Sequence, residues 1–255
     1  MAGLRGRHGG GWPTQWHSVA QHKRWNDRWW STQRNRMASW CGRPGRWRAT
    51  QRLHRCSGED HGEEMKIAIL GWGSLLWDAH PKFDSTHGPW KLEGPRLPLE
   101  FSRVSASRGG ALTLVVDHQS GVACTSAFSL STRKHPDDAI ADLRCREGTT
   151  LENIGYCFSE EGRKQSRNPQ TLAAIEPWAR EEHHDVVIWT DLISNFATKS
   201  TFKVAFTVPN AIAHLQSLPP DAKAKAAEYI WRAPSFVDTP LRREVQVLPW
   251  FKVDG

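Results

Sequence analysis

The sequence lacks the signatures of several common classes of protein. It has no apolar run of the roughly 20 residues that a membrane-spanning helix needs, and no apolar stretch of about 7–15 residues that marks a secretory signal peptide. Its five cysteines include no C-x-x-C pair, the spacing typical of zinc ribbons and redox motifs. On a strand, the adjacent His183 and His184 would point to opposite faces and not share a metal ion. We therefore expect a cytoplasmic protein with reduced thiols, no membrane partner and no metal.

Residues 1–64 have almost no Ile, Val or Leu. They carry instead seven of the 14 Trp and eleven Arg. Without aliphatic residues at a period of 2 or 3.6, no strand or helix has a face that can join a core. The entropy cost of ordering this segment is then not offset by burial, so we predict that it is disordered.

Three interpretations of this segment compete. It is an Arg/Trp arm that binds nucleic acid or anionic membrane, a targeting peptide, or the product of a start codon assigned too far upstream. We favour the third, because G-rich codons encode Arg, Trp and Gly, and because codons for Gly62, Glu63 and Glu64 are purine-rich, like a bacterial ribosome-binding site ahead of Met65. The nucleotide sequence tests this hypothesis: coding bias that continues upstream of Met65 contradicts it.

The formal charge of +7 belongs entirely to the same segment. Residues 1–64 carry 12 of the 34 Lys and Arg but only 5 of the 27 Asp and Glu. Residues 65–255 hold 22 of each sign and are neutral. Because nucleic-acid-binding faces need clustered positive charge, we expect no nucleic-acid partner for residues 65–255.

Residues 65–255 show strand and helix signals in an order that predicts one mixed α+β domain. An alternating stretch, two β-branched runs and glycine-containing links predict a three-stranded meander, and further apolar runs predict additional strands. Pro136, two acids and a closing Gly148 mark a helix that ends at Glu147. The predicted strands are 67–70, 97–105, 111–117, 121–129, 186–189 and 202–208, and the predicted helices 135–147, 210–218 and 222–231. This order favours a curved or barrel-like sheet flanked by helices.

The first of these strands runs into a turn that is suited to binding an anion. The apolar run Ile-Ala-Ile-Leu, from residue 67, is typical of a strand buried on both faces, and Gly-Trp-Gly-Ser-Leu follows it. Gly71 and Gly73 are able to take positive φ, so the N–H groups around Ser74 and Leu75 are expected to converge on a carboxylate or phosphate. The turn is neither a dinucleotide fingerprint nor a Walker loop, because the third glycine and the Gly-Lys-Ser/Thr are missing. A tight connection without a ligand is the alternative.

Two segments together are similar to a known family. Gly-Trp-Gly-Ser-Leu-Leu-Trp-Asp at 71–78 and Leu-Arg-Cys-Arg-Glu-Gly-Thr at 143–149 occupy the places of two motifs of the gamma-glutamylcyclotransferase-like superfamily. The resemblance covers Met65 to about Tyr156 and is loose toward Tyr229 and the C-terminus. It implies a small β-barrel of about five to seven strands with flanking helices, and a cofactor-independent reaction in which a γ-glutamyl amine or peptide closes to 5-oxoproline.

The resemblance also implies roles for particular residues. Glu147 is the expected general base and then acid, and Arg103 is a candidate partner for a substrate carboxylate. The expected substrate-binding turn consists of Gly71, Trp72, Gly73, Ser74 and Leu75. Trp72 departs from the family, which usually has Tyr there, so a hydroxyl is lost or replaced by an indole N–H donor.

Two other interpretations stay open at this point. A lone Glu between an arginine and a helix-ending glycine is by default a surface charge, and Arg103 fits an exposed strand face equally well. The same fold without catalysis would bind a small amine or carboxylate ligand. The sequence does not indicate which γ-glutamyl compound is the substrate, nor the oligomeric state.

Overall fold

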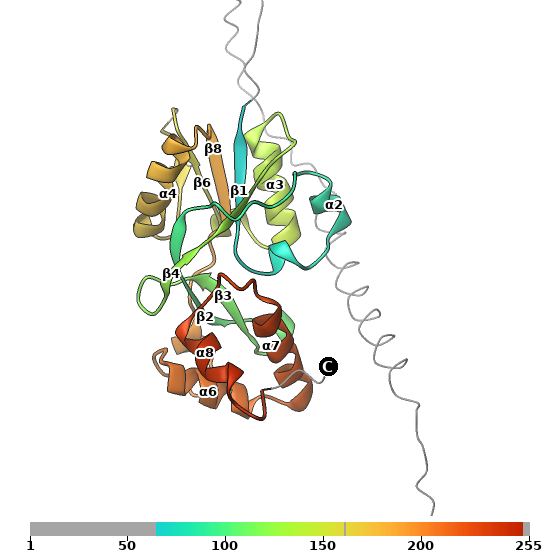
Figure 1. The fold of residues 1–255 in the computed structure, drawn as a ribbon, viewed down its shortest axis with the longest axis vertical. Helices are drawn as coiled ribbons and strands as arrows, with labels where there is room; N and C mark the ends of the chain where they lie inside the picture. The colour runs from blue at the N-terminus through green and yellow to red at the C-terminus, as the bar shows by residue number, and fades with distance from the viewer. Residues whose placement is uncertain (1–64, 161, 252–255) are drawn as a thin grey trace, which may run out of the picture. The chain divides into compact units, whose positions relative to one another are not determined.

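The strands of the described part of the chain, residues 65–160 and 162–251 of the computed structural model, form two sheets (Figure 1). The five-stranded sheet has the order β5-β1-β8-β6-β7, and the three-stranded sheet has the order β3-β2-β4. The strands are β1 (Ile67–Gly71), β2 (Arg96–Val104), β3 (Leu112–Val116), β4 (Val122–Thr125), β5 (Ala127–Leu130), β6 (Ile154–Phe158), β7 (Lys164–Gln165) and β8 (Val186–Thr190). The predicted disorder of residues 1–64, and its three interpretations, lie outside the described residues.

Helices pack against both sheets. The α-helices are α2 (Pro81–Asp84), α3 (Pro136–Glu147), α4 (Pro169–Glu181), α5 (Phe196–Lys199), α6 (Val208–Ser217), α7 (Pro220–Arg232) and α8 (Pro240–Gln246). Short 3-10 helices are η1 (Ser74–Leu76), η2 (Ala106–Arg108) and η3 (Leu151–Asn153). Helices α3 and α4 lie on opposite faces of the five-stranded sheet, and α7 and α8 contact the three-stranded sheet (Figure 1).

Strand β1 is buried along its whole length because both faces of its sheet are covered. It runs parallel to β8 and antiparallel to β5. Ile67 and Ile69 pack in one cluster with Leu143 of α3. Ala68 and Leu70 point the other way, into a larger cluster that includes residues of both sheets and of α7. Because successive side chains of a strand point to opposite faces, β1 contributes to both hydrophobic clusters.

The two sheets are linked by continuous chain and continuous pairing. Only Ser126 separates β4 from β5. The segment before β2 pairs across this junction, where the Gly94 N–H donates to the Ser126 carbonyl at 3.0 Å and Lys91 forms a bridge with Phe128. One long antiparallel pair of segments therefore passes from one sheet into the other.

The predicted α+β class is confirmed, and the more specific barrel is not. No closed barrel is formed by the described strands, which pair as two sheets. The meander order was wrong, because β4 pairs with β2 and not with β3, and the predicted strand 121–129 divides at Ser126. The helix predicted to end at Glu147 is α3. The predicted strand 202–208 was also wrong: this segment has no strand partner, and its alternating Phe202 and Val204 side chains are exposed.

Candidate functional site

Glu147 is the last residue of α3, as the sequence predicted. Gly148 follows in the left-handed conformation at φ 57°, where a residue with a Cβ is strained. The Gly148 N–H donates to the Cys145 carbonyl at 3.2 Å, and the Thr149 N–H donates to the Arg144 carbonyl at 3.2 Å. The helix therefore ends sharply with a partly buried carboxyl group on its final residue.

Arg146 hydrogen-bonds the end of α3 to the segment that follows β1. Its buried guanidinium donates through Nη2 to the Asp78 carbonyl at 3.0 Å and to the Ser74 carbonyl at 3.3 Å. The same nitrogen lies 3.6 Å from Asp78 Oδ2. A planar guanidinium has enough donors to serve several acceptors at once. Arg146 thus holds residues 74–78 against the end of α3, and it brings the two sequence motifs together.

The turn itself is a short 3-10 helix with free donors at its start. The Leu76 N–H donates to the Gly73 carbonyl at 3.0 Å, and the Asp78 N–H donates to the Ser74 carbonyl at 2.8 Å. Within the described part of the chain, no acceptor is bonded to the N–H groups of Gly73, Ser74 or Leu75. Unpaired N–H groups at a helix start are a favourable place for an anion or a carbonyl oxygen.

The two glycines of the turn are required for close approach and not for positive φ. Gly73 has a φ of −127°, and neither Gly71 nor Gly73 is among the glycines with positive φ. A Cβ on Gly71 would lie 2.9 Å from Trp90 Cζ3, and a Cβ on Gly73 would lie 2.9 Å from Tyr229 Oη. The expectation of positive φ was therefore wrong. These positions need glycine because neighbouring side chains leave no room for a Cβ.

Tyr229 and Arg108 complete the surroundings of the turn. Tyr229 of α7 is buried, and its ring packs edge-on against Phe101 and Trp77 at centroid distances of 6.2 and 5.7 Å. The Arg108 guanidinium stacks 4.8 Å from the centroid of the Tyr229 ring, and its Nη2 lies 3.8 Å from Asp78 Oδ2. The sequence pointed to Tyr229 only loosely and to Arg108 not at all, because both reach the turn from other elements.

The charges around Glu147 act on its carboxyl in opposite directions. Loss of solvation on burial raises the pKa of Glu147, and the Asp78 carboxylate raises it further. The guanidinium groups of Arg146 and Arg108 act the other way, and the net pKa is above its ordinary value. A carboxyl with a raised pKa accepts and returns a proton near neutral pH more readily than a solvated one.

Two of the predicted site residues lie apart from this arrangement. Trp72 is buried in the hydrophobic core shared by both sheets. Arg103 donates through Nη1 to the Ile193 carbonyl at 2.8 Å, and burial, followed by the charge of Arg167, lowers its pKa. No contact within the described residues joins Arg103 to the turn or to Glu147.

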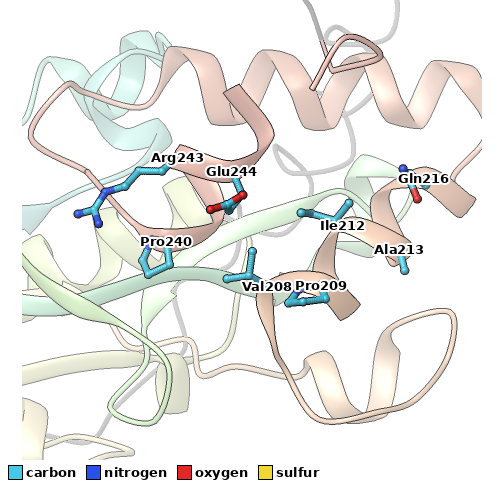
Figure 2. A pocket seen from close by; sticks show the side chains of 8 residues that line it. All are labelled: Val208, Pro209, Ile212, Ala213, Gln216, Pro240, Arg243 and Glu244. Carbon is cyan, nitrogen blue, oxygen red and sulfur yellow. The ribbon is translucent and has the colours of Figure 1, made fainter. Parts of the chain in front are cut away.

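A cavity of about 550 Å³ lies elsewhere, between α6 and α8 (Figure 2). Val208 and Ile212 of α6 line it together with Pro240 of α8, and Arg243 lies at its α8 side. The Arg243 guanidinium is already paired with Asp238, at 2.8 Å. The cavity contains none of the predicted site residues, so the candidate site rests on the geometry around Glu147.

Comparison with known proteins gives no relative: no family model, no curated protein and no solved structure matches this chain. Within the described residues, no helix has the length and apolar character needed to cross a membrane. The same residues contain no group of three or more His, Cys, Asp or Glu arranged to hold a metal ion.

Proposed function

We propose that this chain is a gamma-glutamylcyclotransferase-like enzyme that releases 5-oxoproline from a γ-glutamyl amine or peptide. The observation that carries the proposal is the Arg146 contact, which holds the end of α3 and its Glu147 against the turn with free N–H groups. An acid–base group and an oxygen-binding turn are the two parts that this reaction needs. The raised pKa of Glu147 further supports the proposal.

The reaction is an intramolecular acyl transfer. The α-amine nitrogen of the γ-glutamyl group attacks its own γ-carbonyl carbon, and the bond between that carbon and the leaving nitrogen breaks. Glu147 takes the proton that the attacking nitrogen loses and gives it to the leaving nitrogen. The products are 5-oxoproline and a free amine or peptide, and the carboxylate of Glu147 is regenerated. No protein nucleophile takes part.

The turn contributes orientation. The N–H groups of Gly73, Ser74 and Leu75 bind an oxygen of the substrate, so that the chain folds back and amine and carbonyl meet. Holding two reacting groups in this way supplies a large part of the catalysis of ring closure. Trp72 has no part in this binding except through its backbone, because its side chain is in the core.

The proposal includes the finer fold of that superfamily, a small barrel. Its support is the junction at Ser126, where paired chain continues from the three-stranded sheet into the five-stranded sheet. If the two sheets are regarded as one sheet that curves at Ser126, all of the strand pairs stay the same. The proposal also includes a γ-glutamyl small molecule as the partner, no cofactor and a cytoplasmic location.

The test is release of 5-oxoproline by the full-length protein from γ-glutamyl amino acids, glutathione and Nε-γ-glutamyl-lysine. The Glu147→Gln variant is expected to lose about 10²–10⁴-fold in rate, the usual contribution of a general acid–base group. Glu181→Gln is the matched control, because Glu181 is an exposed residue that also ends a helix. We expect no change in that variant.

A folded protein that releases no 5-oxoproline from any of these compounds contradicts the proposal. The alternative, a non-catalytic member of the same fold, then becomes the better explanation. It predicts that γ-glutamyl compounds bind, and raise the midpoint of thermal unfolding, without being cleaved.

A further inference from the structure

The hydroxyl of Tyr229 lies directly over the turn that is proposed to bind the substrate. A Cβ on Gly73 would be 2.9 Å from Tyr229 Oη but 3.9 Å from Cζ, so the hydroxyl is the atom of the ring nearest to the turn. Phe101, Trp77 and Arg108 surround the ring and fix its position. The hydroxyl therefore lies close to Gly73, the first residue of the turn whose N–H groups have no acceptor among the described residues.

We propose that Tyr229 is a catalytic residue whose hydroxyl donates a hydrogen bond to the γ-carbonyl oxygen of the substrate bound at the turn. This inference rests on the proposed function. Attack of the amine moves negative charge onto that oxygen, and a fixed side-chain donor in addition to the backbone N–H groups of the turn stabilises the charge as it develops. Removal of one such donor in other enzymes lowers kcat about 10²–10³-fold.

The electrostatic surroundings keep this phenol in its donor form. Burial raises the pKa of Tyr229, and the negative charge of Glu147 raises it further, whereas Arg108, the Leu114 backbone and the Ser74 side chain lower it by less. The pKa stays above its ordinary value of 10.0. The phenol is consequently protonated at neutral pH and able to donate.

A purely structural role for Tyr229 is the competing explanation, since buried aromatic rings stabilise cores. Tyr229→Phe separates the two, because it keeps the ring and removes only the hydroxyl. We expect kcat for 5-oxoproline release to fall about 10²-fold or more with little change in KM, because the interaction forms mainly in the transition state. The chain has only one other tyrosine, Tyr156, which packs with Phe158 in the other cluster. Tyr156→Phe is thus the matched control, with unchanged kcat.

Gly73→Ala provides a second, independent comparison. Its methyl group collides with the Tyr229 hydroxyl, so the variant should lose activity and stability. In the double variant Gly73→Ala/Tyr229→Phe, the colliding atom is gone and 3.9 Å remains to the ring carbon. We expect the thermal midpoint to recover while kcat stays at the level of Tyr229→Phe alone.

The outcomes separate this inference from the proposed function. Release by the wild type and by Tyr229→Phe at equal kcat overturns the role of Tyr229 and leaves the proposed function standing. Recovery of wild-type kcat in the double variant also overturns it. Absence of release by the folded wild type, measured beside Glu147→Gln, overturns the proposed function and this inference together.

Discussion

At the scale of single residues, the ionisation of Glu147 sets the pH dependence expected for the proposed reaction. Glu147 must be deprotonated to take a proton, so kcat/KM rises with pH through its pKa. Because that pKa is raised, the rise is expected above the ordinary value of 4.5. Arg108→Gln removes a positive charge that lowers this pKa, so the rise moves to higher pH. A profile of kcat/KM against pH for both proteins checks this, and an identical profile contradicts it.

Glu100 makes a second prediction at this scale, about stability. This fully buried carboxyl on β2 accepts from the Phe101 N–H at 2.7 Å and from the Leu241 N–H of α8 at 3.4 Å. Burial is the main cause that raises its pKa. The folded state therefore binds this proton more tightly than the unfolded state, and the stabilisation is complete below the unfolded value, near 4.5. It is lost as the pH rises through the folded pKa.

Urea unfolding between about pH 4 and 8 tests this linkage. The free energy of unfolding of the wild type should fall with rising pH relative to that of Glu100→Gln, which has no titrating group at this position. Glu93→Gln, on the exposed segment before β2, is the control and should keep the pH dependence of the wild type. Parallel curves for the wild type and Glu100→Gln would show that Glu100 has the same pKa in both states.

The residues of the candidate site were predictable to different degrees. Glu147 and the glycine turn are local features, so the sequence placed them at a helix end and after a strand. Tyr229 of α7 approaches Gly73, and Arg108 of η2 stacks on the Tyr229 ring; only tertiary packing brings them there. Arg103 donates to the Ile193 carbonyl, a contact that could not be predicted because a strand pattern does not specify which partner lies beyond its face.

At the scale of secondary-structure elements, the contact between α3 and the turn depends on one side chain. Arg146→Lys replaces a planar group that bonds two carbonyls with a compact ammonium that cannot copy this geometry. We expect a loss of about 1.5–3 kcal/mol in the free energy of unfolding and slower 5-oxoproline release, because Glu147 is no longer held near the turn. Arg144→Lys, two residues earlier on the same helix, should change stability by less than about 0.5 kcal/mol. Equal stability of the two variants would contradict the role of Arg146.

Elements with strong local signals were predicted well, and those defined by their partners were not. Helix α3 begins with Pro136 and two acids and ends before Gly148, and these signals act within the helix itself. Helix α4 contains Pro177 in its interior, which local rules assign to a helix boundary, but its buried Ile175 and Ala179 hold it against the core. Segment 202–208 differs: its alternating pattern predicts a strand, but no neighbouring strand pairs with it, and no strand forms.

At the scale of the whole described part, the two sheets share one large core. Strand β1, strand β3 and helix α7 all contribute to the same cluster. The sequence predicted the α+β class because the order of strands and helices carries that information. The sequence could not predict the strand order. Strand β4 pairs with β2, and this choice of partner is decided only when the sheet assembles.

The single-residue junction at Ser126 also bears on how such a protein can be divided. The five-stranded sheet takes strands from both before and after the segment that forms the three-stranded sheet. No single cut in the chain separates the two sheets into independent pieces, and a fragment that ends before α7 would keep Glu147 and the glycine turn but lose Tyr229. A site that combines Glu147, the glycine turn and Tyr229 therefore requires one continuous chain from β1 through α7.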